Sequence, residues 1–219
     1  MGHDGHRNDV LDGYRHYIEA LYTSNTSLQR QQFIERTGWR DFVPVVDDDA
    51  ARFLRVILHM QRPKKILEIG TSIGFSATSM ALVARRYGGS IFTVEFDSGV
   101  AGQAQKNFEA AGVDDVVHLI HGDALEIVPG FPDESFDMVF QDVDKRLYPT
   151  LLDDCIRVLR PGGILIGDDA LFPVMNLDEK WSDQVSPMDE FNQKVVSSPE
   201  LESTLLPIGD GMMLAIKRG

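Results

Sequence analysis

The apolar positions of the chain follow a helical period in its first third and change to short, strand-like runs from residue 65 onward. Apolar side chains that recur at three- and four-residue spacing predict amphipathic helices, and Gly, Asp and Pro mark where these helices end or begin. We expect helices at 10–22, at 27–39 up to Gly38, and from Asp47 or Asp48 to Pro63, with an extended segment at 43–46. The region 1–62 is therefore predicted to be a set of N-terminal helices.

From residue 65 short apolar runs alternate with segments of helical spacing. The expected strands cover residues 66–69, 91–96, 116–120, 136–140 and 164–166. The expected helices cover residues 75–86, 100–111 and 151–159, and Pro161-Gly162-Gly163 is expected to turn the chain before the strand at 164–166. This alternation is typical of parallel strands joined by right-handed crossovers. We therefore predict a single α/β domain, 1–219, with a doubly wound, mainly parallel sheet.

Beyond Asp169 the alternation stops. Residues 170–187 have no regular pattern, and they are numerous enough to fold over the edge of the sheet as a lid. A helix is expected near 188–196. Two apolar runs, 201–207 and 212–216, flank a turn with two glycines and predict a closing hairpin.

Each of the five expected parallel strands ends at or beside an acidic residue. These residues are Glu68, Glu95, Asp123, Asp142 and Asp168. One acid at a strand end usually caps the following helix. The carboxyl ends of parallel strands share one edge of the sheet, and ligands of this fold class bind there. Five acids at that edge therefore favour a binding site.

The stretch KILEIGTSIGFS, residues 65–76, contains a strand, a glycine turn and the start of a helix, as in nucleotide-binding crossovers. It differs from the dinucleotide pattern, because Glu68 precedes Gly70 and Gly74 in the spacing E-x-G-x-x-x-G. A carboxylate there would repel a pyrophosphate but would suit an α-amino group. The stretch favours S-adenosylmethionine (SAM) over NAD, with a plain connecting turn as the alternative.

Two further strand ends suit this cofactor. Glu95, at the end of the second strand, can accept both ribose hydroxyls. Asp123, between Gly122 and Ala124, can meet the adenine amino group. Either acid would serve NAD equally well, so the preference for SAM depends on Glu68.

Asp142, Asp168 and Asp169 form a second acidic group at adjacent strand ends. Donor sets made only of oxygen suit Mg²⁺, Mn²⁺ or Ca²⁺ rather than zinc. Without a cation, three close carboxylates would raise one another's pKa, and a divalent ion removes that cost. The alternative is that Asp168 or Asp169 caps the following turn.

Lys145 lies three residues beyond Asp142, at an expected helix start, where a cation is unfavourable. A metal nearby would lower the pKa of its amine further, which would make Lys145 a general base for a substrate hydroxyl. Without the metal, a solvated surface lysine is the better interpretation.

Composition limits the classes of function. With 219 residues, 43% of them hydrophobic, the chain can bury the core of one domain. Its net charge of −13 argues against nucleic-acid and anionic-membrane partners, which need clustered cations. A single cysteine, Cys155, excludes an internal disulfide and fits a reducing compartment. No stretch resembles a signal peptide or a membrane span, so we expect a cytoplasmic protein.

Several stretches together resemble the cation-dependent O-methyltransferases, the family of catechol and caffeoyl-coenzyme A O-methyltransferases and their bacterial relatives. They are ILEIGTSIGFSA, FTVEFD, HGDA, FDMVFQDVDKRLY, LRPGGILIGDDAL and LPIGDGMMLAIK, spread over residues 66–217. The D-x-D-K-x-x-Y element and the C-terminal G-D-G are the most specific. The resemblance implies a seven-stranded methyltransferase sheet whose last strand is antiparallel, and a homodimer.

The same resemblance implies roles for individual residues. SAM contacts would fall on Val46, Glu68, Gly70, Thr71, Ser72, Ser76, Glu95, Phe96, Gly122, Asp123, Ala124 and Asp142. The metal would take Asp142, Asp168 and Asp169, with Lys145 as the base. The family's usual Asp-Asn pair is Asp168-Asp169 here, which should tighten metal binding and weaken the Lewis acidity of the metal.

The predicted reaction is an in-line transfer of the SAM methyl group to an oxygen that the metal holds and activates, with no covalent intermediate. Catechol-like diols fit this geometry, and Trp39, Phe172 and Trp181 could pack against a ring. Other interpretations stay open: a different SAM-fold reaction such as aminopropyl transfer, a SAM-binding sensor without turnover, and, least favoured by the sequence, an NAD-dependent oxidoreductase.

Overall fold

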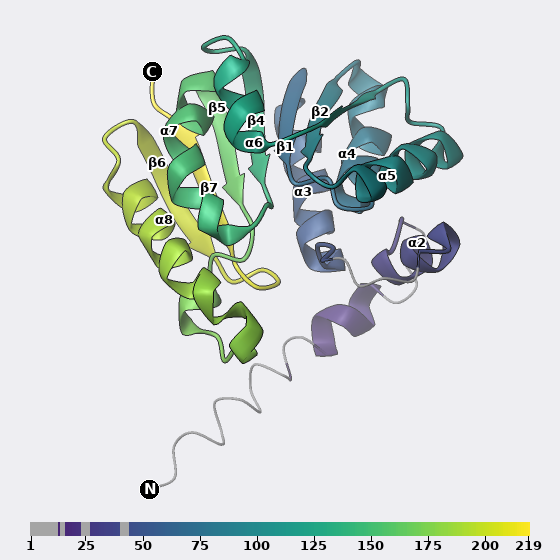
Figure 1. Ribbon diagram of the computed structural model, residues 1–219, viewed down its shortest axis with the longest axis horizontal. Helices are drawn as coiled ribbons and strands as arrows, with labels where there is room; N and C mark the ends of the chain where they lie inside the picture. The colour runs from purple at the N-terminus through teal and green to yellow at the C-terminus, as the bar shows by residue number, and fades with distance from the viewer. Residues whose placement is uncertain (1–12, 14–15, 23–26, 40–43) are drawn as a thin grey trace, which may run out of the picture.

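The centre of the protein is a seven-stranded sheet of order β3-β2-β1-β4-β5-β7-β6 (Figure 1). The structure, a computed structural model, describes residues 13, 16–22, 27–39 and 44–219. The strands are β1 (Lys65–Ile69), β2 (Ser90–Glu95), β3 (Val117–His121), β4 (Phe136–Gln141), β5 (Leu159–Gly167), β6 (Leu201–Leu206) and β7 (Met212–Lys217). Strands β1 to β5 pair in parallel, and β7 is antiparallel to β5 and β6. The predicted mainly parallel sheet with an antiparallel last strand is confirmed.

Helices cover both faces of the sheet (Figure 1). One face carries α2 (Arg30–Thr37), α3 (Asp48–Gln61), α4 (Phe75–Ala84) and α5 (Ser98–Ala111), and the other carries α6 (Ala124–Ile127), α7 (Tyr148–Val158) and α8 (Val185–Ser197). Short 3-10 helices are η1 (Arg85–Tyr87), η2 (Val128–Gly130), η3 (Lys145–Leu147), η4 (Phe172–Val174) and η5 (Glu179–Gln184). The layers are those of a doubly wound fold.

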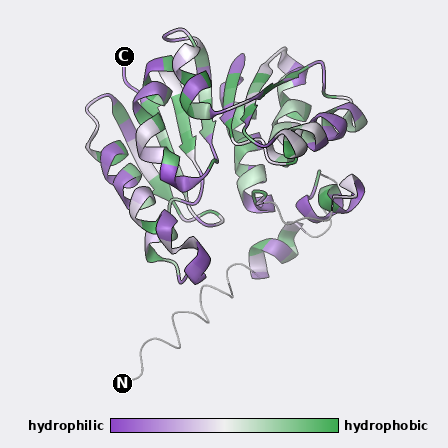
Figure 2. Cartoon of the chain, viewed as in Figure 1, coloured by the Kyte–Doolittle hydropathy of each residue, from purple (hydrophilic) through white to green (hydrophobic). Residues whose placement is uncertain are grey.

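The inner strands are apolar on both sides because helices cover both sides. In β1, Ile66 packs with the cluster under α3, α4 and α5, whereas Leu67 and Ile69 pack under α7 and α8. All three side chains are fully buried. Figure 2 shows the same division, with strands mostly hydrophobic and polar residues along the outer sides of the helices. Continuous apolar runs are the pattern expected of strands buried on both faces.

Two predicted signals, the stop at Gly38 and the cap at Asp47, are confirmed in the N-terminal helices, whereas α2 begins at Arg30 and not at residue 27. Residues 16–22 are helical. Helix α2 ends at Gly38, which has a left-handed φ of 68°. Helix α3 is capped by Asp47, whose carboxylate accepts the Ala50 N–H at 2.7 Å. Four apolar positions of these predicted segments lie outside the described residues: Val10, Leu11, Tyr14 and Val43.

The prediction of a turn at Pro161-Gly162-Gly163 is wrong. Strand β5 runs through these residues, and its register with β4 shifts between Phe136 and Met138. Gly162 has φ +76°, and a Cβ on Gly163 would lie 2.8 Å from the Arg160 carbonyl oxygen. Glycine is needed in both places, but the result is a bulge within one strand rather than a change of direction.

The region after Asp169 is more regular than predicted. Residues 170–187 contain η4, η5 and the start of α8, and the closing hairpin of β6 and β7 is confirmed. Within the part of the chain that the structure describes, no helix combines the length and the apolar character needed to cross a membrane.

Candidate functional site

The site lies at the point in the sheet where the order of the strands reverses. From β1 the chain continues to β2 and β3 on one side, and β4 and β5 lie on the other, so a crevice forms beyond β1 and β4. Gly70 follows β1 and Asp142 follows β4. Gly70 has φ +98°, and a Cβ added there would lie 1.9 Å from the Asp142 carbonyl oxygen. The glycine therefore allows two strand ends to meet, in addition to the predicted approach of a ligand.

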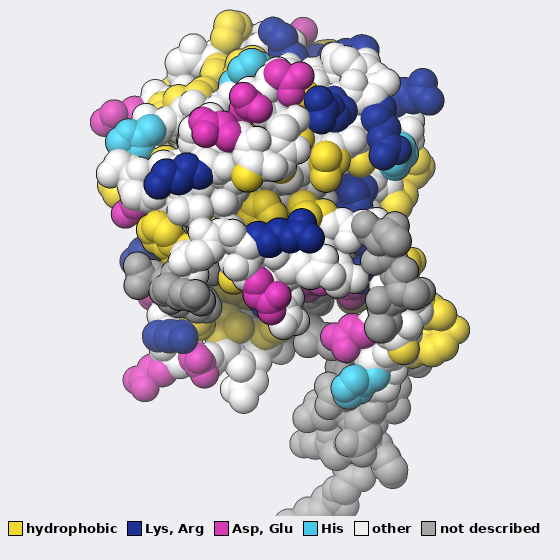
Figure 3. All heavy atoms as spheres, turned by 90° about the vertical axis from the view of Figure 1, so that its right-hand side faces the viewer, with side chains coloured by type: hydrophobic (Ala, Val, Ile, Leu, Met, Phe, Trp, Pro, Cys, Tyr) yellow, Lys and Arg dark blue, Asp and Glu magenta, His cyan; other side chains and the backbone are white. Residues whose placement is uncertain are grey.

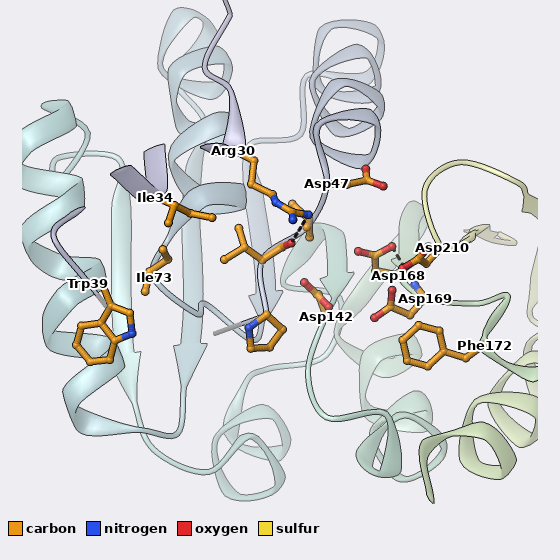
Figure 4. A pocket seen from close by; sticks show the side chains of 13 residues that line it. Arg30, Ile34, Trp39, Asp47, Ile73, Asp142, Asp168, Asp169, Phe172 and Asp210 are labelled. Carbon is orange, nitrogen blue, oxygen red and sulfur yellow. Dashed lines mark hydrogen bonds between the residues drawn. The ribbon is translucent and has the colours of Figure 1, made fainter. Parts of the chain in front are cut away.

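A cavity of about 430 Å³ opens at this crevice (Figure 4). Its walls come from α2, the segment 44–47, the ends of β4 and β5, and the loop between β6 and β7. They include Arg30, Trp39, Val46, Asp47, Asp142, Asp168, Asp169, Phe172 and Asp210. Val46 thus lies where a SAM contact was predicted. Among the described residues Trp39 and Phe172 line the cavity but Trp181 does not, because η5, which carries it, packs against α8 and η3.

The G-D-G motif supplies one wall of the cavity. The carbonyl groups of Asp210 and Gly211 accept the N–H groups of Leu171 and Ala170 at 2.9 Å each. Gly211 has φ +102°, and a Cβ there would lie 2.6 Å from the Leu171 nitrogen. The motif therefore holds the hairpin loop against the segment after β5, which brings the Asp210 side chain beside Asp168 and Asp169 (Figure 4).

The Lys145 ammonium lies between two carboxylates of the cavity. Lys145 begins η3, and its Nζ lies 2.8 Å from Asp142 Oδ1 and 2.8 Å from Asp169 Oδ2. The lysine is 5% exposed, so these carboxylates, rather than water, solvate its charge. The structure thus brings together the predicted catalytic pair, Lys145 and Asp142.

Without a metal, the surroundings of Lys145 keep its amine protonated. Burial lowers the pKa of the amine, but nearby negative groups, Asp142 first, raise it to well above its ordinary value. These carboxylates outweigh the unfavourable helix start, and the lowering expected beside a bound cation stays a prediction. Lys145 is therefore an ammonium ion here and not a solvated surface residue.

Asp168 and Asp169 complete the acidic cluster. Burial raises the pKa of both, and the charge of Asp142 raises it further, although Lys145 acts in the opposite sense. The Asp168 carboxylate accepts the Asp169 N–H at 2.9 Å, so part of the turn-capping alternative is also correct. Asp169 has φ +61°, a left-handed conformation that aspartate and asparagine tolerate better than most residues.

The cluster has the type of donor atoms that bind a metal, but these atoms are not arranged as a metal site in this structure. Its donors are carboxylate oxygens, which suit a hard divalent cation, and it already binds one positive group, the Lys145 ammonium. Within the ranges that the structure describes, no three Asp, Glu, His or Cys side chains form a group that could hold a metal ion. A metal at these oxygens would compete with Lys145 for Asp142 and Asp169.

Glu68 is fully buried beneath the glycine turn. Its Oε2 accepts the Thr93 hydroxyl at 2.5 Å, and Thr93 in turn contacts the Thr71 hydroxyl at 2.6 Å. Burial raises the pKa of Glu68 to about 8, against hydrogen bonds from Ser76 and Thr93. Among the described residues, Oε1 has no hydrogen-bond partner of good geometry. The contact of Glu68 with an α-amino group stays a prediction, and Oε1 is the atom that could make it.

The other predicted cofactor contacts lie along the same edge of the sheet. Glu95 accepts the Ser72 N–H at 2.8 Å and the Asp97 N–H at 3.0 Å. Asp123 accepts the Leu125 N–H at 2.9 Å and so caps α6, as the alternative interpretation of strand-end acids expects. A cap uses only part of a carboxylate, which can accept about four hydrogen bonds. The remaining predicted contacts along this edge are Phe96, which is exposed, Gly122 and Ala124.

Sequence reasoning missed several residues of the site. Arg30, Asp47 and Asp210 line the cavity, and the Tyr148 hydroxyl lies 3.3 Å from Lys145 Nζ. Asp210 and Tyr148 belong to the two most specific motifs, so their place in those motifs was an available signal. Arg30 lies in the N-terminal third, outside the quoted motifs, and no pattern singled it out.

Known proteins are similar to this chain in sequence. A family model described as O-methyltransferase matches residues 26–218. A catechol O-methyltransferase of Niastella koreensis is 30% identical over 220 residues, which cover 95% of this chain and 98% of that protein. A caffeoyl-CoA O-methyltransferase of Populus kitakamiensis is 28% identical over 183 residues, which cover 78% and 76%.

Solved structures show the same fold. The O-methyltransferase from Bacillus cereus, solved in complex with SAH, superposes with a TM-score of 0.79 over 91% of this chain and 96% of that chain. The two chains are 23% identical, so the likeness concerns the fold.

Proposed function

Because this chain is an enzyme of the O-methyltransferase family, we propose that it transfers the methyl group of SAM to a hydroxyl oxygen of a small acceptor. One observation carries the proposal. The glycine turn that suits SAM and the acid–lysine cluster that suits a reacting hydroxyl adjoin one cavity, beyond β1 and β4. No nucleic acid or membrane enters this proposal, and on the face seen in Figure 3 basic and acidic side chains are interspersed.

We assign SAM to the sheet edge between β1 and β3. The proposed contacts are Val46, Glu68, Gly70, Thr71, Ser72, Ser76, Glu95, Phe96, Gly122, Asp123, Ala124 and Asp142. Two features support this assignment. Glu68 Oε1 is a buried acceptor without a partner of good geometry in the described chain, and Glu95 keeps lone pairs for two ribose hydroxyls.

Replacing Glu95 with glutamine should lower SAM affinity at least tenfold, because each charge-assisted hydrogen bond is worth about 1.5–3 kcal/mol. The amide also brings an N–H₂ group against the N–H of Ser72 or Asp97, which both donate to this side chain. Calorimetry measures the change. Glu126→Gln, at an exposed glutamate of α6, is the matched control and should leave the affinity unchanged. Equal affinities in the two variants would remove Glu95 from the site.

The proposed acceptor is a catechol-like or phenolic molecule. A cavity of about 430 Å³ suits a small ring compound, and Phe172 lines it beside Asp169 (Figure 4). Two adjacent hydroxyls would meet a cluster rich in hydrogen-bond acceptors and a single ammonium donor. The similarity to proteins named catechol O-methyltransferase and caffeoyl-CoA O-methyltransferase supports this choice.

We propose that Asp142, Asp168 and Asp169 hold a divalent cation, Mg²⁺ or alternatively Mn²⁺ or Ca²⁺. When bound, such a cation supplies charge that lowers the pKa of an acceptor hydroxyl and of the Lys145 amine. Asp142 and Asp169 orient the lysine at 2.8 Å from each carboxylate. With its pKa lowered in this way, Lys145 would be a neutral amine that could take the hydroxyl proton and become an ammonium ion, and Asp142 would hold it in place.

Changing Asp169 to asparagine should weaken divalent-metal binding by roughly tenfold, because metal affinity follows the charge of the ligand set. Catalysis should remain measurable at saturating metal. A Mn²⁺ titration of the protein without acceptor gives the midpoint. Asp115→Asn, at a side chain that is 68% exposed, is the control. If the Mn²⁺ titrations of Asp169→Asn and of the wild type have the same midpoint, Asp169 is not a metal ligand.

A methyl-transfer screen tests the proposed function. The protein is incubated with SAM and a panel of vicinal diols and monohydric phenols, with Mg²⁺ or with EDTA, and methylated products are measured by mass spectrometry. We expect transfer to vicinal diols that EDTA abolishes. SAM binding without transfer to any acceptor would indicate a sensor, and EDTA-insensitive turnover of decarboxylated SAM with an amine would indicate aminopropyl transfer.

We also propose that the protein forms a homodimer. Large apolar side chains are exposed on the helix at 16–22 and on α3, among them Tyr17 at 66% and Met60 at 68%. The two helices are neighbours, since the Arg52 guanidinium lies 4.0 Å from the centre of the Tyr22 ring. Exposed apolar surface of this kind is typical of an interface. Sedimentation velocity at micromolar concentration would show a monomer if the proposal is wrong.

A further inference from the structure

The Tyr148 hydroxyl connects the ends of two strands with Lys145. It donates to the Gln141 carbonyl, the last of β4, at 2.6 Å. It lies 3.3 Å from the Asp168 carbonyl, directly after β5, and 3.3 Å from Lys145 Nζ. The residues that follow these strand ends, Asp142 and Asp168, carry the carboxylates of the acidic cluster.

Packing holds the Tyr148 ring without help from its hydroxyl. The side chain is fully buried, and its ring meets Phe191 edge-to-face at 5.0 Å between centroids. A Cβ added to Gly167 would lie 3.0 Å from the Phe191 ring and 3.5 Å from the Tyr148 ring, so both rings pack closely against β5. Phenylalanine would fill the same space, so the hydroxyl is not needed to pack the ring.

The hydroxyl completes the set of hydrogen bonds around Lys145. An ammonium group has three N–H donors. Here three acceptors surround it: Asp142 Oδ1 and Asp169 Oδ2 at 2.8 Å, and Tyr148 Oη at 3.3 Å. With two carboxylate acceptors alone, Nζ could rotate about the axis that joins them. A third acceptor, on another element, fixes the orientation of the ammonium group.

Removing the hydroxyl leaves the Gln141 carbonyl paired, because this carbonyl also accepts the Asp168 N–H at 3.1 Å. The Lys145 ammonium and the Asp168 carbonyl each lose the contact of 3.3 Å that they make with the hydroxyl. The loss therefore falls on Lys145 and the acidic cluster.

We propose that Tyr148 is a positioning residue for the methyl-transfer site: its hydroxyl sets the spacing of the Asp142 and Asp168 strand ends and fixes the direction of the Lys145 ammonium. The proposal deepens the proposed function and depends on it for its kinetic part. Tyr148 does not touch the acceptor or SAM, so its effect should appear in turnover and not in binding.

Tyr148→Phe tests the proposal. We expect kcat to fall roughly 10- to 100-fold, the usual result of a small misplacement in an active site, with SAM affinity and acceptor KM unchanged. Tyr87→Phe is the matched control, because the Tyr87 hydroxyl is buried without a hydrogen-bond partner among the described residues. Its kcat should equal that of the wild type.

A second measurement does not require turnover. Reductive methylation with formaldehyde, followed by peptide mass spectrometry, gives the rate at which Lys145 is modified, with the exposed Lys106 as an internal reference. Relative to Lys106, Lys145 should react severalfold faster in Tyr148→Phe than in the wild type or in Tyr87→Phe.

The outcomes separate this inference from the proposed function. A wild type without methyl transfer would overturn the function, while the labelling rates would still test the position of Lys145. An active wild type with unchanged kcat and unchanged labelling in Tyr148→Phe would overturn the inference alone. A lower melting temperature with wild-type kcat would assign the hydroxyl a structural role and also overturn it.

Discussion

Replacing Lys145 with alanine should reduce kcat for methyl transfer by roughly 10²–10⁴-fold, the usual contribution of a positioned acid or base. The side chain is 5% exposed, and Asp142 and Asp169 hold its Nζ at 2.8 Å each, so alanine removes the only amine placed at these two carboxylates among the described residues. SAM affinity should hardly change, because the methyl donor does not need this amine. Steady-state kinetics with a catechol acceptor and calorimetry with SAM measure the two quantities.

Raising the pH should partly rescue Lys145→Ala, because an acidic hydroxyl can ionise without a base. Catechols should therefore be rescued better than simple alcohols. Lys106→Ala, at an exposed lysine of α5, is the control and should have the kcat of the wild type. Circular dichroism should show both variants folded. Wild-type turnover by Lys145→Ala at pH 7 would leave Lys145 without a role in proton transfer.

Replacing Gly70 with alanine should destabilise the protein by roughly 2–5 kcal/mol and abolish SAM binding. The added Cβ would lie 1.9 Å from the Asp142 carbonyl oxygen and 3.1 Å from the Val143 Cα, both backbone atoms that cannot rotate away. The φ of +98° adds strain for any residue with a side chain. The ends of β1 and β4 must then separate. Thermal unfolding should show a Tm lower by roughly 5–15 °C.

Gly102→Ala is the control, because at this position a side chain can be added without a clash. Gly102 lies within α5, and a Cβ there would have no atom within 4 Å. Alanine is the better helix former, so this variant should be more stable by roughly 0.5–1 kcal/mol. If Gly70→Ala instead melts with the wild type and binds SAM, the two strand ends do not need to approach closely.

Several features of the site required knowledge of neighbours from distant parts of the chain. The segment Pro161-Gly162-Gly163 has the local signals of a turn, yet pairing with β4 continues through it as a bulge. Asp123 caps α6 and also faces the predicted cofactor edge, and sequence spacing cannot separate these two uses. Trp181 and Phe172 were equivalent candidates for packing a ring until η5 placed only Phe172 at the cavity.

The sequence by itself determined most of the elements, the direction of the strands and the edge of the sheet at which the acids gather. Apolar runs, the Asp47 cap, the stop at Gly38 and the closing hairpin act over a few residues, so their patterns can be read locally. Only the tertiary structure showed which groups surround the Lys145 ammonium, among them the Tyr148 hydroxyl. These interactions depend on distances of about 3 Å between groups from different elements, and Coulomb energy and hydrogen bonding change steeply over such distances.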